Sequence, residues 1–267
     1  MRREAVTIGH KKLSYLIAEP PGPAVRQRPA STVVFLHAFP LQSGMWESSL
    51  ASVPEGWRAV APDYRGEPGI RMGDLAGDVV DLLDHLGVTQ AAVVGCSMGG
   101  YVLFELMKSA PRYVSAIGLV STRPGADNEE GRKNRQKMIE LIDREGVEAV
   151  AAQMVPKLLG STTQHDQPDL PEKVRNLIVE NPPERVKGWV AAMMERGDST
   201  PLLAKIDVPA LVVHGAEDAL IPPSEAEGMH HAIRNSRLEI LPLSGHLSNL
   251  EQAMPFEGIL WSFLKKS

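Results

Sequence analysis

A serine flanked by glycines lies where a strand-like run gives way to a helix-like run. The motif Gly95-Cys96-Ser97-Met98-Gly99 follows the apolar run 91–94 and precedes helical material at 101–107. A serine on so sharp a strand-to-helix turn exposes its hydroxyl above a sheet, and the amino end of the helix favours a developing negative charge. Ser97 therefore suits nucleophilic attack on a carbonyl carbon; the alternative is a serine that only caps the helix.

A serine nucleophile needs a base within hydrogen-bond reach, and the chain offers eight histidines. His246 follows the strand-like run 238–241, which places it at the carboxyl edge of a sheet. The other histidines lie in a hairpin turn, on helices, or at the end of an earlier strand. We therefore predict that His246 is the base.

An acid is expected between the serine and the histidine in chain order, after the penultimate strand. Asp218 lies in the loop that follows the run 210–214. Its neighbour Glu217 is the weaker alternative, and both carboxylates could instead be solvated turn residues. The sequence thus predicts a catalytic triad of Ser97, Asp218 and His246.

A second loop can complete the site by binding the substrate's carbonyl oxygen, which becomes negatively charged when the serine attacks the carbonyl carbon. The run 33–36 leads into His37-Ala38-Phe39-Pro40. The backbone N–H of Phe39 would then face that of Met98, and such donors contribute a few kcal/mol each in a transition state. We expect His37 to hold its own loop, and Asp63-Tyr64-Arg65-Gly66 to be a turn with an internal ion pair. Cys96 is expected to be inert packing.

Short apolar runs alternate with helical patterns along most of the chain, which predicts an α/β fold with a mostly parallel sheet and helices on both faces. An antiparallel hairpin is expected first. The strand-like runs are 5–8, 13–18, 32–37, 58–62, 91–96, 116–121, 210–214 and 238–241. The helical patterns are 74–86, a segment from about 97 to 110, one from 222, and 256–264.

This alternation breaks between residues 123 and 206, where only helical patterns occur. We interpret 123–206 as a helical cap inserted into a core formed by 1–122 and 207–267. Asp127 or Asn128 is expected to begin its first helix and Gly146 to end it. The predicted substrate pocket consists of Met154, Leu158, Trp189, Met193 and Met194 from the cap, with Phe39, Met98 and Leu247 below. Trp189 either limits the length of the substrate or packs between cap helices.

The composition excludes several classes of function. The 267 residues carry a net charge of −5, which does not suit nucleic acid. The single cysteine fits a reducing cytoplasm, and neither a signal-peptide pattern nor a membrane-length apolar run is present. No metal-ligand cluster, dinucleotide motif or phosphate loop is found, so no cofactor is expected. We predict a cytoplasmic enzyme that acts on a small molecule; no protein partner is indicated.

These motifs, together with Gly245-His246 and the stretch 122–135, resemble the α/β-hydrolase superfamily, and within it the 3-oxoadipate enol-lactonase-like branch. The resemblance implies carboxylesterases, arylesterases and acyl-homoserine lactonases as functional relatives. It implies the same triad and oxyanion donors. Two positions depart from the family pattern: Ala38 replaces the usual glycine after His37, and Glu67-Pro68 replaces the common His-Gly.

The leading hypothesis is a serine carboxylesterase or lactonase that acts on small, mainly apolar esters. Enol-lactones or acyl-homoserine lactones are the alternative substrates. A different class of function is a ligand-perceiving receptor of the same fold with slow turnover. No arginine pair is placed clearly enough in the sequence to predict an anionic substrate.

Overall fold

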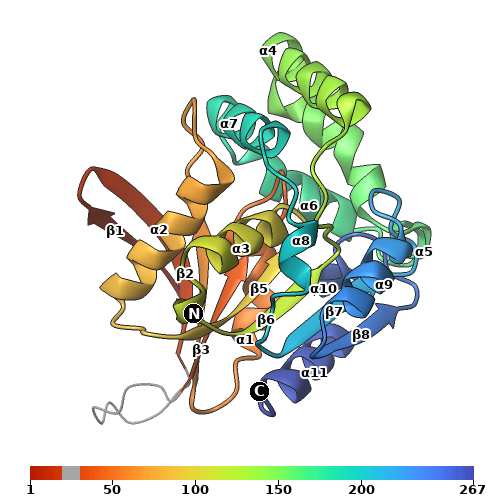
Figure 1. Ribbon diagram of the computed structural model, residues 1–267. Coiled ribbons are helices and arrows are strands. Elements are labelled where there is room, and N and C mark those ends of the chain that lie inside the picture. The colour runs from red at the N-terminus through yellow and green to blue at the C-terminus, as the bar shows by residue number, and fades with distance from the viewer. Residues whose placement is uncertain (20–30) are drawn as a thin grey trace.

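The computed structural model describes residues 1–19 and 31–267, and its centre is an eight-stranded sheet (Figure 1). The proline-rich sequence of residues 20–29 predicts a connector, and this prediction lies outside the described residues. The strands are β1 (Arg2–Ile8), β2 (Lys11–Ala18), β3 (Ser31–Leu36), β4 (Trp57–Asp63), β5 (Ala91–Cys96), β6 (Val114–Val120), β7 (Ala210–Gly215) and β8 (Ser236–Leu241). Their spatial order is β1-β2-β4-β3-β5-β6-β7-β8.

The pairing of these strands confirms the predicted hairpin and the predicted parallel sheet. The β1 and β2 strands pair antiparallel, and β2 pairs antiparallel with β4. From β4 through β3 to β8 every pairing is parallel. The carboxyl ends of these six strands therefore lie along one edge of the sheet, where the loops that carry Phe39, Ser97, Asp218 and His246 begin.

Helices cover the sheet because its central strands are apolar on both faces. The β5 and β7 strands are buried at every position. The main core helices are α2 (Met72–His85), α3 (Met98–Ser109), α9 (Pro223–Ala232) and α11 (Ala253–Leu264). The shorter ones are η1 (Ser43–Trp46), α1 (Glu47–Ala51), η2 (Pro111–Tyr113) and α10 (Ser248–Glu251).

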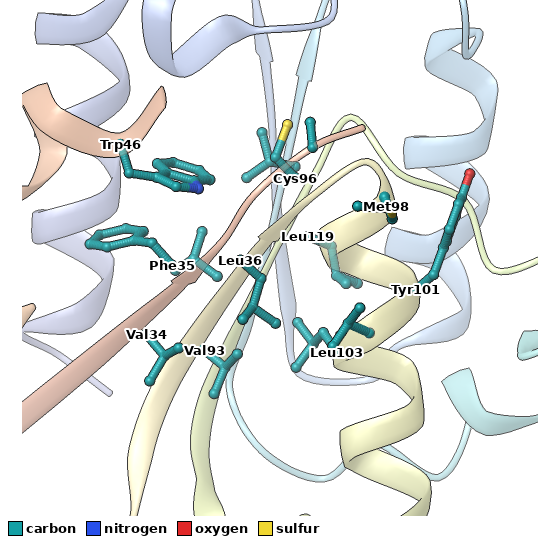
Figure 2. Close-up of a cluster of buried hydrophobic side chains, with 14 of the residues drawn as sticks. Val34, Phe35, Leu36, Trp46, Val93, Cys96, Met98, Tyr101, Leu103 and Leu119 are labelled. Carbon is teal, nitrogen blue, oxygen red and sulfur yellow. The ribbon is translucent and has the colours of Figure 1, made fainter. Parts of the chain in front are cut away.

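Consecutive residues of β3 show how the two faces are filled, since side chains of a strand alternate between them. Phe35 stacks on Trp46 with ring centroids 4.9 Å apart. Figure 2 shows these two rings on one side of β3 and Leu36 on the other, toward Leu103 of α3. The helix that follows Ser97 is thus anchored by apolar packing beneath the site.

Only helices lie between β6 and β7, and we call them the α4–α8 segment. They are α4 (Glu129–Leu158), α5 (Ser161–Asp166), α6 (Leu170–Val179), α7 (Pro183–Met194) and α8 (Thr200–Leu203). The Asn128 side chain begins α4 by accepting the Gly131 N–H at 2.8 Å. Gly146, with φ of +78°, breaks α4 where the sequence predicts a helix end. Figure 1 shows α4 and α7 beyond one edge of the sheet.

No helix in residues 1–19 or 31–267 combines the length and the apolar character that crossing a membrane requires.

Candidate active site

Ser97 lies between the end of β5 and the first residue of α3, in a left-handed backbone conformation with φ of 52°. A non-glycine residue rarely adopts this conformation, so the surrounding structure must impose it. A β-carbon on Gly95 would overlap the Gly99 carbonyl, and one on Gly99 would overlap the carbonyl of Leu36. The glycines are therefore needed for the chain to turn this sharply.

Two hydrogen bonds hold the turn from the end of the neighbouring strand β6 and the residues just after it. The Ser97 amide donates to Val120 O at 2.9 Å, and the Thr122 hydroxyl donates to Ser97 O at 2.8 Å. The Ser97 side chain itself is partly exposed in a cavity. The backbone of Ser97 is thus fixed by hydrogen bonds, and its side chain is accessible from the cavity.

His246 lies in the loop between β8 and α10, and the buried carboxylate of Glu251 binds this loop on both sides of the histidine. Glu251 accepts the amides of Gly245 at 2.9 Å and Leu247 at 3.0 Å. It also accepts the amide of Gly160, just after α4, at 2.8 Å. Glu251 therefore joins the histidine loop to the α4–α8 segment.

The imidazole of His246 pairs with Asp218, which follows β7. Nδ1 lies 2.7 Å from Asp218 Oδ2, and both side chains are buried. The other carboxylate oxygen accepts the amides of Leu220 and Ile221 at 2.9 and 3.0 Å. Burial opposes ionisation, but the charge and hydrogen bond of His246 and these amides hold the pKa of Asp218 below its usual value. With Nδ1 donating to Asp218, Nε2 is left to accept a proton.

The alternative acid, Glu217, is directed elsewhere. Its carboxylate accepts the Thr162 amide at 2.9 Å and the Ser161 hydroxyl at 3.0 Å. The structure thus brings Asp218, and not Glu217, to the histidine.

A second histidine contacts the same acid. His214 Nε2 lies 2.9 Å from Ile221 O and 3.3 Å from Asp218 Oδ2. Burial lowers the pKa of His214, so this ring is neutral and its Nε2–H can serve both oxygens. Sequence analysis did not assign this role to His214, because a histidine at the end of a strand has many possible roles.

The predicted oxyanion donors are the backbone N–H groups of Phe39 and Met98. No hydrogen bond within the described part of the chain uses the Phe39 or Met98 amide as donor. The Ala38 amide, which lies between His37 and Phe39 in the same loop, already donates a hydrogen bond to Met45 Sδ at 3.1 Å. Both predicted oxyanion donors are therefore available.

His37 holds its own loop, as predicted. Its Nε2 accepts the Tyr64 amide at 3.2 Å, and Nδ1 lies 3.1 Å from Ala38 O. Complete burial lowers the pKa of His37 to about 4. The ring is therefore neutral near pH 7 and bridges two loops.

The predicted ion pair within Asp63–Gly66 is a wrong prediction. Arg65 instead forms two hydrogen bonds with Asp78 of α2, at 2.7 and 3.0 Å. Asp63 accepts from Arg3 of β1 and from Ser14 of β2. Both charges are used to attach the turn to neighbouring elements rather than to each other.

A small cavity of about 170 Å³ joins these groups. Its lining consists of Phe39, Ser97, Tyr101, Arg123, Arg135, Met154, Met193, Leu220, Ile221 and His246. Met154 and Met193 were predicted to line it. Leu220 and Ile221 were missed, although they lie directly after Asp218.

The remaining residues predicted for the pocket do not line this cavity. Leu158 and Leu247 are completely buried, and Met194 is partly exposed at the end of α7. Trp189 is also completely buried; its Nε1–H donates to Arg65 O at 2.7 Å, and its ring lies 5.3 Å from that of His37. Trp189 therefore packs the α4–α8 segment onto the core, the second of the two roles considered for it, and does not line the cavity.

Two arginines, Arg123 and Arg135, line the cavity, and the sequence analysis did not predict this. Arg123 and Arg135 both contact Asp127, at 2.8 and 3.1 Å, and Arg196 contacts the same carboxylate at 3.0 Å. Burial alone would raise the pKa of Asp127, but the Arg196 hydrogen bond and the charge of Arg135 lower it to about 2. The only sequence signal was the spacing of Arg123, Asp127 and Arg135 around a helix start.

The described residues include no candidate metal site. Within the described ranges 1–19 and 31–267, no group of three or more histidine, cysteine, aspartate or glutamate side chains is arranged to hold a metal ion.

Comparison with known proteins agrees with this architecture. Residues 31–253 match the family model of the alpha/beta hydrolase fold, and the chain belongs to this family. It is 26% identical over 246 residues to 3-oxoadipate enol-lactonase 2 of Acinetobacter baylyi, with 90% of each chain covered. The predicted fold class is confirmed, and these relatives are hydrolases.

Two solved structures are similar over nearly the whole chain. A thermophilic esterase from Thermogutta terrifontis, in a malate-bound structure, superimposes with a TM-score of 0.90 at 30% identity, covering 100% of this chain and 99% of the esterase. The enol-lactonase from Burkholderia xenovorans LB400 gives 0.87 at 24% identity, covering 98% and 100%. At 24% identity, the similarity to this enol-lactonase shows only that the two proteins share a fold.

Proposed function

We propose that this protein is a serine hydrolase of small carboxylic esters or lactones, acting through an acyl-enzyme on Ser97. The observation that carries the proposal is the Asp218–His246 pair at 2.7 Å, with His246 and Ser97 lining one small cavity. Its relatives include a thermophilic esterase and a 3-oxoadipate enol-lactonase. The apolar lining from Phe39, Met154, Met193 and the Leu220-Ile221 pair suits short acyl and alcohol groups.

The reaction follows from the roles of these groups. His246 Nε2 takes the Ser97 proton as Oγ attacks the ester carbonyl, and then delivers it to the leaving alcohol. Asp218 stabilises the imidazolium through Nδ1. The amides of Phe39 and Met98 bind the oxyanion, where such donors act most strongly on the transition state. His246 then activates water, which releases the acid and regenerates Ser97.

The proposal is tested with aryl acyl esters of increasing length and a set of lactones. Ser97→Ala should abolish turnover of every substrate. Ser109→Ala is the matched control, because Ser109 is exposed at the other end of the same helix α3. Substantial turnover by Ser97→Ala would refute the acyl-enzyme mechanism, and the relative rates of the set would decide between ester and lactone.

A further inference from the structure

The proposed oxyanion donor Phe39 lies in a tight turn of the loop that follows β3. The Leu41 amide donates to Ala38 O at 2.9 Å, which closes this turn around the two residues between them. Next to Phe39, the carbonyl oxygen of Pro40 accepts a hydrogen bond from Asn181 Nδ2 at 3.1 Å. Within the described part of the chain, no other hydrogen bond reaches Pro40 O. One side chain therefore holds the carbonyl adjacent to the proposed donor.

Asn181 belongs to the α4–α8 segment, where it lies just after the end of α6. It is 141 positions away from Pro40 in sequence and is almost completely buried. A carboxamide NH₂ group has two donors. Beside Pro40 O, the second acceptor at 3.1 Å is Leu177 O, a carbonyl of the last turn of α6. Leu41 O and Ile178 O lie at 3.4 Å. The NH₂ group thus joins the end of α6 to the turn around Phe39.

Two planar peptide groups connect Asn181 to the proposed oxyanion donor. Pro40 O and the Leu41 amide belong to the first group, and this amide donates to Ala38 O. Ala38 O and the Phe39 amide belong to the second group. The C=O and N–H of a trans peptide group lie in one plane and point in opposite directions. Asn181 therefore orients the first group, and the first group orients the second, which carries the Phe39 N–H.

The core holds the same turn from its other side. The Ala38 amide donates to Met45 Sδ at 3.1 Å, and Met45 O accepts a hydrogen bond from Asn249 of α10 at 2.8 Å. In the described ranges, no side chain of the α4–α8 segment other than Asn181 donates to the turn 38–41. The orientation of the Phe39 amide thus depends on the core and on this one contact from the segment.

We propose that Asn181 is a positioning residue for the oxyanion donor Phe39, acting through the two peptide groups of the turn 38–41. The proposal rests on the proposed function and deepens it, because it gives the α4–α8 segment a part in catalysis beyond lining the cavity. Asn181 itself does not line the cavity. Linked hydrogen bonds also polarise one another, which strengthens the last donor of the chain. The oxyanion develops only as the carbonyl is attacked, so the effect belongs to the transition state.

The variant Asn181→Ser separates positioning from simple packing. A serine hydroxyl can donate to the carbonyl four positions earlier, here Leu177 O, so the end of α6 keeps a partner while the contact with Pro40 O is lost. We expect kcat on an aryl ester to fall roughly 10- to 100-fold, with little change in KM, because a displaced donor acts weakly on the transition state. Asn176→Ala, at an exposed position of α6, is the matched control and should keep the wild-type kcat.

A pair of ketone inhibitors tests whether the affected group is the oxyanion site. Ser97 Oγ adds to the carbonyl carbon of 1,1,1-trifluoropentan-2-one, the carbonyl π bond opens, and the serine proton passes to His246. The ketone oxygen then carries the negative charge, as in the transition state. Pentan-2-one has the same carbon chain but a carbonyl far less prone to addition. In Asn181→Ser the inhibition constant of the trifluoro ketone should rise about as much as kcat/KM falls, and that of pentan-2-one should not change.

Inhibition constants do not depend on how much of a preparation is folded, so they remain informative if the variant is less stable. A lower Tm with wild-type kcat and unchanged inhibition by both ketones would reduce Asn181 to a packing role and overturn the proposal. Equal weakening of both ketones would also overturn it, because it would indicate a general change of the cavity.

Hydrogen exchange separates the failure of this inference from the failure of the proposed function. The Leu41 amide should exchange faster in Asn181→Ser than in Asn176→Ala, since the turn has lost a support. If Ser97→Ala kept its turnover while this difference held, Asn181 would position the turn but the acyl-enzyme mechanism would be wrong. If Ser97→Ala were inactive and exchange and kcat were unchanged in Asn181→Ser, the mechanism would stand without the positioning role.

Discussion

At the scale of single residues, the site combines an imposed backbone conformation with a fixed sequence of hydrogen bonds. Ser97 is held in a left-handed conformation by its glycine neighbours, and Asp218 is held by two amides as well as by His246. Each contact reduces the freedom of a reacting group before the substrate arrives. Such preorganisation makes positioned donors and bases effective.

The proposed triad predicts unequal effects of its three members. Ser97→Ala and His246→Ala should each lower kcat by a similar factor of roughly 10⁶, because serine and base act as one unit. Asp218→Asn should cost less, roughly 10⁴, since the imidazole can still act without its partner. Steady-state kinetics on one aryl ester measures all three. A histidine variant that retained a tenth of wild-type activity would rule out His246 as the base.

Buried His37 predicts a specific loss of stability in acid. Its pKa is about 4 in the folded protein, against ~6.5 for a free histidine, so the unfolded chain binds the extra proton as the pH falls through this interval. Stability from neutral His37 is therefore present at pH 7 and declines below about 6.5. Between pH 7 and pH 5, wild type should lose roughly 2 kcal/mol more unfolding free energy than His37→Gln.

Urea denaturation at the two pH values provides this measurement. Subtracting the change in unfolding free energy of His37→Gln from that of wild type cancels the contributions of other groups. These include His214, whose pKa is also lowered in the folded protein. Equal pH dependence in the two proteins would mean that His37 is not the buried neutral group described here.

At the scale of elements, loops at the carboxyl ends of parallel strands supply every proposed catalytic group. These loops could be predicted, because buried strand runs and their order identify the edge at which they meet. The predicted hairpin, the helix break at Gly146 and the role of His37 follow from local signals of the same kind.

Contacts between elements that are distant in sequence could not be predicted. Glu251 binds Gly160, which is 91 positions away. Trp189 donates a hydrogen bond to the Arg65 carbonyl, 124 positions away. The apolar face of α7 that was predicted to line the pocket therefore packs in part against the core. Arg123, in the loop before α4, and Arg135, on α4, both contact Asp127. A single sequence contains no periodicity that reveals such pairs.

The Glu251 clamp predicts that a conservative change will affect catalysis from outside the cavity. Glu251→Gln replaces one acceptor oxygen with an NH₂ group that faces backbone N–H donors, which costs roughly 1–3 kcal/mol. The loop around His246 should loosen, so kcat should fall severalfold with little change in KM. Glu227→Gln removes the same charge from an exposed position of α9 and is the control. A Glu251→Gln protein of lower Tm but unchanged kcat would limit Glu251 to a structural role.

At the scale of the whole molecule, the α4–α8 segment and the sheet form one continuous packed structure around the cavity. Trp189 is completely buried and donates to the Arg65 carbonyl of the core, and a β-carbon on Gly188 would overlap the Gly66 backbone. The segment therefore contributes side chains to the cavity while its own position depends on the core.

Removing this contact should affect stability rather than selectivity. Trp189→Ala should lower the unfolding free energy by about 3–5 kcal/mol, as for other large buried aromatic residues. Its kcat/KM should change by a similar factor on short and long acyl esters, because the side chain lies outside the cavity lining. Thermal denaturation and an ester series test both statements. A selective gain on long esters would place Trp189 at the substrate after all.

The central claim is that Ser97 forms a covalent acyl-enzyme, and an active-site-directed organophosphate tests it most directly. Diethyl 4-nitrophenyl phosphate transfers its phosphoryl group to an activated serine, and the product resists hydrolysis. Intact-mass and peptide analysis should show a single adduct per chain, located on Ser97, that forms in step with the loss of esterase activity and is absent in Ser97→Ala. An unmodified Ser97 in an inactivated protein, or full activity in a protein modified at Ser97, would contradict the account.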